Sequence, residues 1–274
     1  MAETAGPNSP RRKLTVSIVT FRSDADEFRR TLLSLRTALQ EFARDDVAIF
    51  VIENSPQNEV GEIVAQELAS WTVEVLHGHG NVGFGRAHNL ILDRTGEYHL
   101  ILNPDIEMRP DALQKALRFL EEHPACGLLT PMAYWPDGGR QYLCKRYPAL
   151  FDLLLRGFAP ARLAAMFDQR LARYEMRAET QDEVHWEPPI VSGCFMFFRG
   201  DVLRALGGFD EAYFLYFEDF DLSLRAGKKT QIAYVPAVRV VHAGGKAGKK
   251  GWWHIRQFGK SAVRFYATHG LKLF

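Results

Sequence analysis

The sequence predicts an α/β protein whose mostly parallel central sheet is flanked by helices. Runs of β-branched apolar residues, such as "LTVSIVTF" at residues 14–21, are typical of strands that are covered on both faces. Between these runs lie segments with apolar residues at helical spacing, such as Phe28, Leu32, Leu35 and Leu39. Strands and helices alternate through the first half of the chain, which is the order that builds a parallel doubly wound sheet.

The N-terminal half contains the most regular elements. Its expected strands are residues 14–21, 47–56, 72–78 and 98–103. Its expected helices are residues 24–43, residues 58–70, and a third that follows a loop within "GHGNVGFGRAHNLIL" at residues 78–92.

The C-terminal half is less regular, and five segments are expected in it. They are a helix at residues 109–124, strands and turns at 127–150, an amphipathic helical insertion at 150–176 that Pro160 breaks, a strand, helix, turn and helix at 191–227, and a last strand pair or hairpin at 232–245.

Composition and charge exclude several classes of protein. The 274 residues are 47% hydrophobic and 24% charged, which is ordinary for a globular chain and unlike a disordered or collagenous one. A formal net charge of +1 gives no overall field that would select nucleic acid as a partner. No stretch reaches the roughly 18 apolar residues of a membrane helix, and the polar N-terminus lacks the apolar core of a signal peptide. The three cysteines form no CxxC pair, which favours a reducing compartment, so we expect a cytoplasmic location.

Polar or flexible residues occupy the carboxyl ends of the expected strands. In open parallel sheets the ligand crevice lies outside these ends. The first strand ends at Thr20 and Phe21, the second at Glu53 and Asn54, the third at the glycine-rich loop, and the fourth at Asn103-Pro104-Asp105.

The sequence Asn103-Pro104-Asp105 has two interpretations. Pro104 has no amide hydrogen, so it should end the strand, and Asp105 should leave the sheet toward solvent. A carboxylate at such an edge can bind Mg²⁺ or Mn²⁺, hard cations that share their coordination shell with phosphate oxygens and water. The alternative is a simple turn, because all three residues favour turns.

The stretch "GHGNVG" at residues 78–83 has the spacing G-x-G-x-x-G of dinucleotide-binding Rossmann folds. That fingerprint usually follows the first strand of its unit, with an acidic residue about 20 positions further on. Here two strand–helix units come first, and the nearest candidate, Asp105, lies beyond that spacing. The alternative is a glycine-rich turn that only lets the backbone bend.

A cluster of acidic residues lies in "FLYFEDFDLSLR" at residues 214–225. The cluster consists of Glu218, Asp219 and Asp221 among aromatic residues, and apolar neighbours raise the pKa of carboxylates, which favours a general base. The alternative is a solvated helix start, where acidic residues complement the helix dipole. His242, after "VRVV", has the chemistry to bind a metal or a phosphate, or it is structural.

Taken together, these segments resemble the inverting family 2 glycosyltransferases of GT-A fold, and most closely their rhamnosyltransferase-like branch. The matching segments occur in family order over roughly residues 14–245 and are "TVSIVTF", "VIENSP", "NVGFGRAHN", "LNPD", "SGCFMFFRGDVLRALGGFDEAYFLYFEDFDLSLR" and "VVHAGG". The resemblance implies a GT-A (Rossmann-like) domain at residues 14–245, with its nucleotide-binding half at about 14–108 and its acceptor half at about 109–245. Residues 1–13 would be a disordered lead and residues 246–274 a basic aromatic C-terminal helical segment.

The resemblance also implies a reaction. A sugar, with rhamnose as the first expectation, would pass from a dTDP- or UDP-linked donor to a hydroxyl of a glycan or lipid-linked glycan in cell-surface polysaccharide synthesis. Glu53 would contact the base or ribose, in place of the family's shorter acid, and Arg86 would contact a phosphate. The implied nucleotide site consists of Thr20, Phe21, Glu53, Asn81, Gly83, Gly85, Arg86 and Asn103.

The resemblance assigns the remaining roles. Asn103 and Asp105 match the family's D-x-D element with its first acid replaced by an amide, so Asp105 would be the main ligand to Mg²⁺ or Mn²⁺, assisted by His242. Glu218 and Asp219 match the catalytic Glu-Asp pair, with Asp219 as general base. The residues that would shape the acceptor side are Trp186, Ser192 and Gly193.

Two questions stay open at this level. Residues 244–272 mix lysine and arginine with tryptophan and phenylalanine, which fits either peripheral membrane contact or a terminal helix docked on the domain. The rival functions are an NAD-type Rossmann oxidoreductase built on "GHGNVG" and a non-catalytic sugar-nucleotide-binding module.

Overall fold

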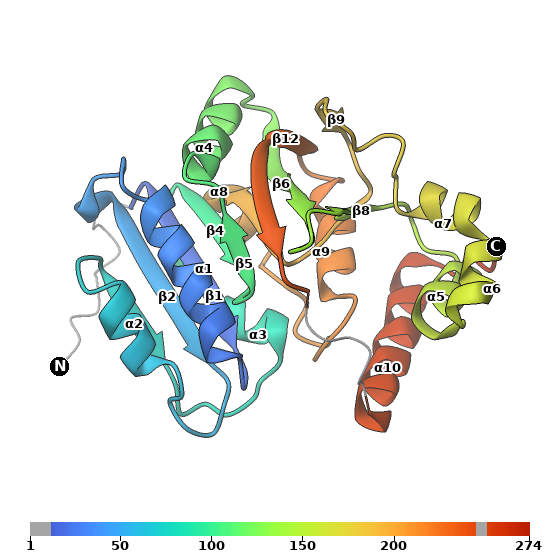
Figure 1. Cartoon of the computed structure of the whole chain (residues 1–274), viewed down its shortest axis with the longest axis horizontal. Coiled ribbons are helices and arrows are strands. Elements are labelled where there is room, and N and C mark those ends of the chain that lie inside the picture. The colour runs from blue at the N-terminus through green and yellow to red at the C-terminus, as the bar shows by residue number, and fades with distance from the viewer. Residues whose placement is uncertain (1–11, 245–250) are drawn as a thin grey trace.

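The computed structural model describes residues 12–244 and 251–274 (Figure 1). The expected lead at residues 1–13 lies almost wholly outside these ranges. Lys246, Lys249 and Lys250, which belong to the expected basic C-terminal segment, also lie outside them.

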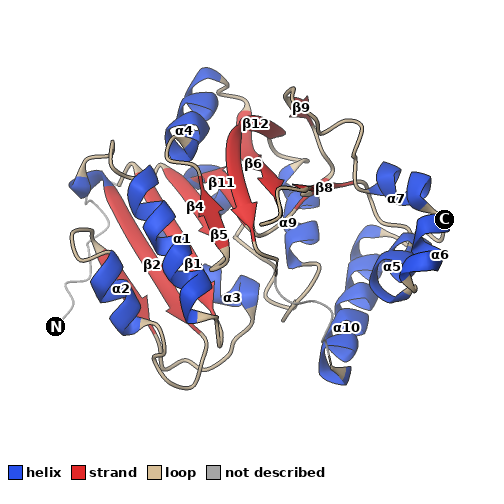
Figure 2. Ribbon diagram, in the orientation of Figure 1, coloured by secondary structure: helices blue, strands red, loops and turns tan. Residues whose placement is uncertain are grey.

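A curled sheet of ten strands forms the centre of the molecule (Figure 2). Its main order is β3-β2-β1-β4-β11-β6-β12-β5, with β7 paired to β6 and β9 paired to β12. The strands are β1 (Leu14–Thr20), β2 (Val47–Glu53), β3 (Val73–Leu76), β4 (Tyr98–Leu102), β5 (Ile106–Met108), β6 (Cys126–Tyr134), β7 (Arg140–Gln141), β9 (His185–Trp186), β11 (Phe195–Arg199) and β12 (Gln231–His242). A separate antiparallel pair consists of β8 (Cys144–Lys145) and β10 (Ile190–Val191).

The first half of the sheet is parallel, as the sequence predicts. β1 pairs in parallel with both β2 and β4, and β2 pairs in parallel with β3. The second half is mixed, because β11 runs antiparallel to β4 and β6, while β12 runs parallel to β6 and antiparallel to β5. The carboxyl ends of β1, β2 and β4 therefore meet the start of β11 and the end of β12 at one edge.

Helices cover both faces of the sheet (Figure 1). One face packs against α1 (Ala25–Ala38), α2 (Gly61–Glu67) and α4 (Ala112–Glu122), which contribute buried apolar side chains to the largest core cluster. The other face packs against α3 (Phe84–Asn89), α8 (Gly200–Ala205) and α9 (Glu218–Ala226). Two short 3₁₀ helices lie at Arg44–Asp46 and Leu92–Arg94.

A group of helices lies beside the sheet, to the right in Figure 1. The expected insertion consists of α5 (Leu150–Phe158), α6 (Ala161–Met166) and α7 (Asp168–Tyr174), and Pro160 separates the first two as predicted. The C-terminal helix α10 (Trp252–His269) buries Ser261, Ala262 and Phe265 against this side of the molecule. None of the helices within the described ranges is long and apolar enough to cross a membrane.

The structure corrects the expected strand pair at residues 232–245. This segment is one strand, β12, which stays paired with β6 along its length and shifts register between Val235 and Arg239. Pro236 lies in this shift, and because proline cannot donate to a ladder, the strand bulges there instead of reversing. Helices α1, α2 and α4 are also shorter than predicted, and β5 was not expected.

Candidate active site

Asp105 and His242 meet where two strands end. β4 stops at Leu102, as Pro104 predicts, and β5 then pairs with the end of β12 so that Ile106 lies opposite His242. This pairing leaves 3.4 Å between Asp105 Oδ2 and His242 Nε2. The sequence predicts that Asp105 points toward solvent, and this prediction is wrong: its side chain is only 13% exposed. Its Oδ1 is buried without a hydrogen-bond partner in the part of the chain described.

The orientation of His242 is fixed by its neighbours. Its Nδ1 lies 2.9 Å from Gln141 Oε1 of β7, and its ring stacks on Trp135 at 6.5 Å between centroids. With Gln141 Oε1 as acceptor, Nδ1 is a donor, and Nε2 is the ring nitrogen on the side of Asp105. A second ring partner of this kind is the usual support of a metal-binding histidine.

Asp219 lies in the first turn of α9 and is held by backbone amides. Gly193 N donates to its Oδ2 at 2.9 Å and Phe220 N donates to its Oδ1 at 3.0 Å. Gly193 allows this close approach, since a Cβ there would lie 3.1 Å from the Asp219 Cβ. Both carboxylate oxygens are therefore oriented before any substrate binds.

Glu218 and Asp219 differ in their surroundings. Burial, followed by the charge of Asp219, raises the pKa of Glu218, whose Oε2 is buried and unpaired among the described residues. Burial also raises the pKa of Asp219, while the amides of Gly193 and Phe220 oppose that shift. The amide donors therefore favour the charged form at Asp219 more than at Glu218.

A backbone connection joins the two carboxylate sites. Asn103 N, one residue past β4, donates to Cys194 O at 2.9 Å, and the residue before Cys194 is the Gly193 that binds Asp219. The ladder between β4 and β11 thus fixes the spacing between the Asp105 corner and the start of α9.

The turn before α9 is strained. Tyr216 and Phe217 have φ angles of 71° and 67°, a left-handed region that non-glycine residues occupy at a cost of roughly 1–3 kcal/mol each. Phe217 is buried among Phe220, Phe258 and Phe265, with ring centroids 5.1 to 5.3 Å apart. Packing against α10 therefore holds the backbone that presents the acidic pair.

The ends of β1 and β2 form the expected nucleotide side. Glu53 is fully buried; its Oε1 accepts from Ser55 N at 2.8 Å, while its Oε2 has no partner within the described part of the chain. Thr20 is buried and its Oγ1 lies 3.4 Å from Ile52 O, whereas the Phe21 side chain is 45% exposed. An unpaired buried carboxylate oxygen is costly, so the Glu53 site is suited to a ligand hydroxyl or amide.

The glycine-rich loop packs close to the segment before α9. Gly83 has φ 93°, and a Cβ there would lie 2.3 Å from Phe214 O; Asn81 Oδ1 accepts from Gly83 N at 3.0 Å. A Cβ on Gly85 would lie 2.7 Å from Phe209. Arg86, which is expected to contact a phosphate, uses its Nε to donate a hydrogen bond to Glu211 O.

Asn54 has a structural role at this site that sequence reasoning missed. Its Nδ2 donates to Gly83 O at 3.0 Å and its Oδ1 lies 2.9 Å from His79 Nε2. These two bonds attach the glycine-rich loop to the end of β2.

Of the expected acceptor residues, the structure brings Ser192 and Gly193 to the acidic pair, but not Trp186. Trp186 pairs with Ala233 near the start of β12, at the end opposite His242. Its ring lies 5.6 Å from that of Phe119 and 5.4 Å from that of His123, which are on and beside α4.

A cavity of about 450 Å³ lies beside Asp219 and His242. Its remaining walls come from the segment after β6 and from the helical insertion. The lining residues are Trp135, Arg140, Gln141, Tyr142, Leu143, Lys145, Arg156, Glu175, Arg177, Ser192, Asp219, Phe220 and His242. Sequence reasoning missed the cationic members, because they are scattered over an irregular region and belong to no motif.

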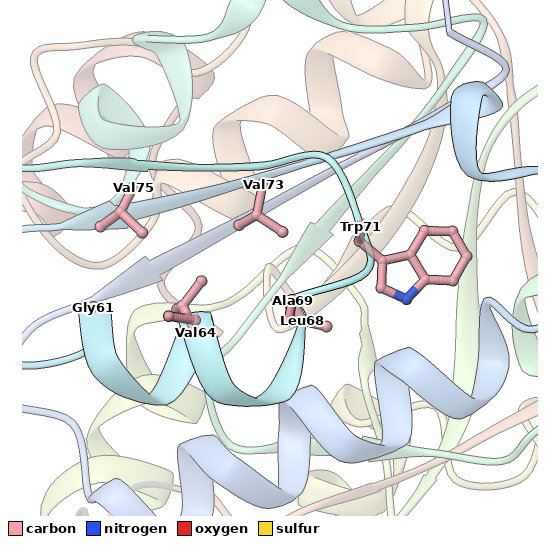
Figure 3. Close-up of a pocket in the computed structure, with 8 residues that line it drawn as sticks. Gly61, Val64, Leu68, Ala69, Trp71, Val73 and Val75 are labelled. Atoms are coloured by element: carbon pink, nitrogen blue, oxygen red, sulfur yellow. The ribbon is translucent and has the colours of Figure 1, made fainter.

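A second hollow lies between α2 and β3 (Figure 3). It is lined only by glycine and apolar residues, among them Val64, Leu68, Trp71 and Val73. With no ionisable side chain in its lining, it has no group that could catalyse a reaction.

The residues at the Asp105 corner fit one hard divalent cation. Asp105 supplies a buried oxygen that has no partner among the residues described, and His242 supplies an oriented nitrogen. Within the described ranges, three or more acidic, histidine or cysteine side chains nowhere gather in a metal-binding group. Such a corner suits an ion that completes its shell with phosphate oxygens and water.

Comparison with known proteins gives consistent matches. A family model described as "Glycosyl transferase family 2" matches residues 15–207. The N-acetylglucosaminyl-diphospho-decaprenol L-rhamnosyltransferase of Mycobacterium tuberculosis is 27% identical over 272 residues, covering 93% of this chain and 84% of that protein. Rhamnosyltransferase WbbL of Escherichia coli is 25% identical over 205 residues, covering 69% of this chain and 71% of that protein.

A solved structure supports the fold. The mannosyltransferase PcManGT from Pyrobaculum calidifontis, in complex with GDP-Man and Mn²⁺, superposes with a TM-score of 0.61 at 21% identity. The match covers 93% of this chain and 65% of that one.

Proposed function

Because this chain belongs to glycosyl transferase family 2, we propose that it transfers L-rhamnose from a dTDP-linked donor to a hydroxyl of a diphospholipid-linked sugar, with inversion at the anomeric carbon. Family membership carries the sugar transfer. The rhamnosyl group is supported by the two relatives whose names contain it. The lipid-linked acceptor is supported by the name of the mycobacterial relative.

The observation that carries the chemistry is the arrangement of Asp219 and Asp105 around one edge of the sheet. Asp219 has oriented oxygens and a raised pKa, which suits it to take a proton from an acceptor hydroxyl as that oxygen attacks. The donor diphosphate would leave on the opposite side, toward Asp105 and His242. A single displacement of this kind inverts the sugar.

Asp105 and His242 are the residues that we assign to a divalent cation, Mn²⁺ or Mg²⁺. The Mn²⁺ in the mannosyltransferase complex supports this assignment. When bound, the ion supplies positive charge that stabilises the leaving diphosphate. Glu53, with its free Oε2, would bind the ribose or base of the nucleotide.

The NAD interpretation of "GHGNVG" is not supported. In the structure this loop follows β3 and is attached to β2 by Asn54, two strands away from where the dinucleotide fingerprint belongs. The family match places the same loop inside a glycosyltransferase domain.

Ligand-dependent thermal stability tests the function. A ligand that binds only the folded protein raises its Tm by mass action, so dTDP or UDP with Mn²⁺ should raise the Tm and NAD should not. The same preparation is then given dTDP-rhamnose and an N-acetylglucosaminyl-diphospholipid. Formation of a rhamnosylated lipid would confirm the proposal. Stabilisation by nucleotide without transfer to any acceptor would instead indicate a non-catalytic sugar-nucleotide-binding module.

A further inference from the structure

Lys145 is a buried cation whose charge the mechanism above does not use. It lies on β8, its side chain lines the cavity beside Asp219, and the residue is only 6% exposed. Its Nζ donates to Tyr142 O, which leaves two of the three ammonium donors. Within the residues described, no carboxylate lies within 4.0 Å of this ammonium group. A buried charge without an opposite partner is costly, so the site is suited to an anionic ligand.

Further cations surround this ammonium group. Arg156 and Arg177 both bind Glu175, at 3.1 and 2.8 Å, so one carboxylate is shared between two guanidinium groups. Arg140 lines the same cavity and is 3.4 Å from Asp182. Arg177 has an additional partner outside the cavity, Asp168, at 2.8 Å.

The lining therefore carries an excess of positive charge. It contains four basic side chains, Lys145 and three arginines, against the two acids Glu175 and Asp219. Asp168 and Asp182, which bind Arg177 and Arg140, lie outside the lining, and their side chains are 64% and 82% exposed. Burial lowers the pKa of Lys145 to about 8, which still leaves most of the ammonium groups charged at pH 7. An anion bound here would restore that pKa toward its ordinary value.

The position of the cavity indicates which substrate it receives. Asp219, Ser192 and His242 line it, whereas Thr20, Glu53 and the glycine-rich loop do not. The cavity thus borders the proposed metal corner at His242, while Lys145 on β8 and Arg156 on α5 belong to the half of the chain after β6. An anion held by these two cations therefore lies away from the expected nucleotide side. The volume of about 450 Å³ falls in the range of about 300–1,000 Å³ that is usual for small-ligand sites.

We propose that Lys145, with Arg156 and Arg177, binds the diphosphate group of the acceptor and so places the acceptor hydroxyl at Asp219. This inference rests on the proposed glycosyl transfer and adds the chemistry by which the acceptor is recognised. The diphosphate of a nucleotide donor is the other source of the same chemistry, and the experiment separates the two.

The test compares two acceptors in the full-length protein. One is an N-acetylglucosaminyl-diphospholipid with a short chain, and the other is an octyl glycoside of the same sugar, which has no phosphate. In Lys145→Met, KM for the diphosphate acceptor should rise about tenfold or more, which is the loss expected for a charge-assisted contact. KM for the octyl glycoside, and the Tm increase given by dTDP with Mn²⁺, should not change. The matched control is Lys229→Met, an exposed lysine beyond α9.

Binding without transfer gives an independent measurement. Inorganic pyrophosphate in the absence of metal should raise the Tm of the wild type and raise that of Lys145→Met less. If Lys145→Met folds poorly, Arg177→Gln is examined in the same way, since its side chain is 32% exposed. The inference would be overturned if the ratio of the KM values for the two acceptors were the same in the variants as in the wild type. It would also be overturned if the variants bound dTDP more weakly while KM for the diphosphate acceptor stayed unchanged. If pyrophosphate binds but no sugar is transferred, the proposed function is rejected, while the assignment of an anion-binding site at Lys145 stands.

Discussion

Two adjacent acids in α9 have different surroundings. Asp219 lines the cavity and accepts hydrogen bonds from two backbone amides, while Glu218 is buried with one oxygen that has no partner among the described residues. Amide donors favour the charged form of a carboxylate, and an apolar site favours the neutral form. These surroundings suit Asp219 to the role of general base that we propose for it.

Replacing the proposed base tests its role. Asp219→Asn keeps the shape of the side chain but cannot accept the acceptor's proton, so kcat should fall by about 10²–10⁴-fold. The Tm increase given by dTDP with Mn²⁺ should remain, because that nucleotide lies on the other side of the site. Rates are measured by release of dTDP from dTDP-rhamnose. Retention of most of the wild-type kcat would contradict the assignment.

The proton on Glu218 should make stability depend on pH. Burial raises the pKa of Glu218 from an ordinary value of 4.5 to about 8, so the folded state binds this proton more tightly than the unfolded state. Its stabilising effect is complete below the ordinary pKa and is lost as pH rises toward 8. Relative to wild type, Glu218→Gln should therefore gain stability with rising pH, by at most about 1.4 kcal/mol per pH unit. Urea unfolding at pH 5 and pH 8 measures this, and an equal difference at both pH values would refute it.

At the scale of elements, α10 holds the strained turn before Glu218 and Asp219. Ser261 donates to Leu215 O at 2.7 Å, the Tyr216 hydroxyl lies 2.9 Å from His254 Nδ1, and His269 pairs with Asp221 at 2.8 Å. Residues far apart in the sequence thus fix the backbone at Tyr216 and Phe217.

A matched pair of core substitutions tests this function of α10. Phe265→Ala and Phe28→Ala each remove a fully buried ring, and each should lower the free energy of unfolding by about 3–5 kcal/mol. Phe28 lies on α1 in a different core cluster. At a temperature where both variants are folded, Phe265→Ala should lose kcat and Phe28→Ala should not. Equal kcat values would show that α10 contributes stability alone.

The sequence predicted the elements better than their contacts. Strand ends such as Glu53 and the Pro104 stop follow from local periodicity and backbone chemistry, and the structure places them as predicted. The position of Trp186 depends on which strand β9 joins, and that of Lys145 on how the insertion folds back; neither is encoded in local spacing. The segment was predicted as a strand pair, but β12 pairs with β6 on both sides of Pro236, and this non-local pairing keeps it a single strand.

At the scale of the whole molecule, the insertion, α10 and the C-terminus lie on one side, to the right in Figure 1, and carry exposed apolar side chains. Exposed side chains include Met166 at 79%, Phe274 at 76%, Trp252 at 78% and Val263 at 73%. The opposite face of α10 packs on the domain through Phe258 and Phe265. Docking on the domain and contact with a membrane would therefore use different faces of α10. The structure describes the docked face, and membrane contact stays a prediction.

Vesicle binding tests the membrane contact that we propose for this surface. Vesicles containing anionic lipid should carry the protein upward in a flotation gradient, and Trp252→Ser with Trp253→Ser should reduce the floated fraction severalfold. These substitutions leave the buried face of α10 intact. Leu90→Ser, which changes an exposed apolar residue at the end of α3, is the control. Equal flotation of all three proteins would reject the contact.

The most direct measurement is a crystal structure with dTDP-rhamnose and Mn²⁺, using Asp219→Asn to prevent turnover. We predict an anomalous peak that places the manganese ion next to Asp105, with diphosphate oxygens in the coordination shell of the ion. Residue 219 should face the anomeric carbon from the side opposite the diphosphate. A manganese ion bound elsewhere, with the sugar remote from residue 219, would contradict the proposed mechanism.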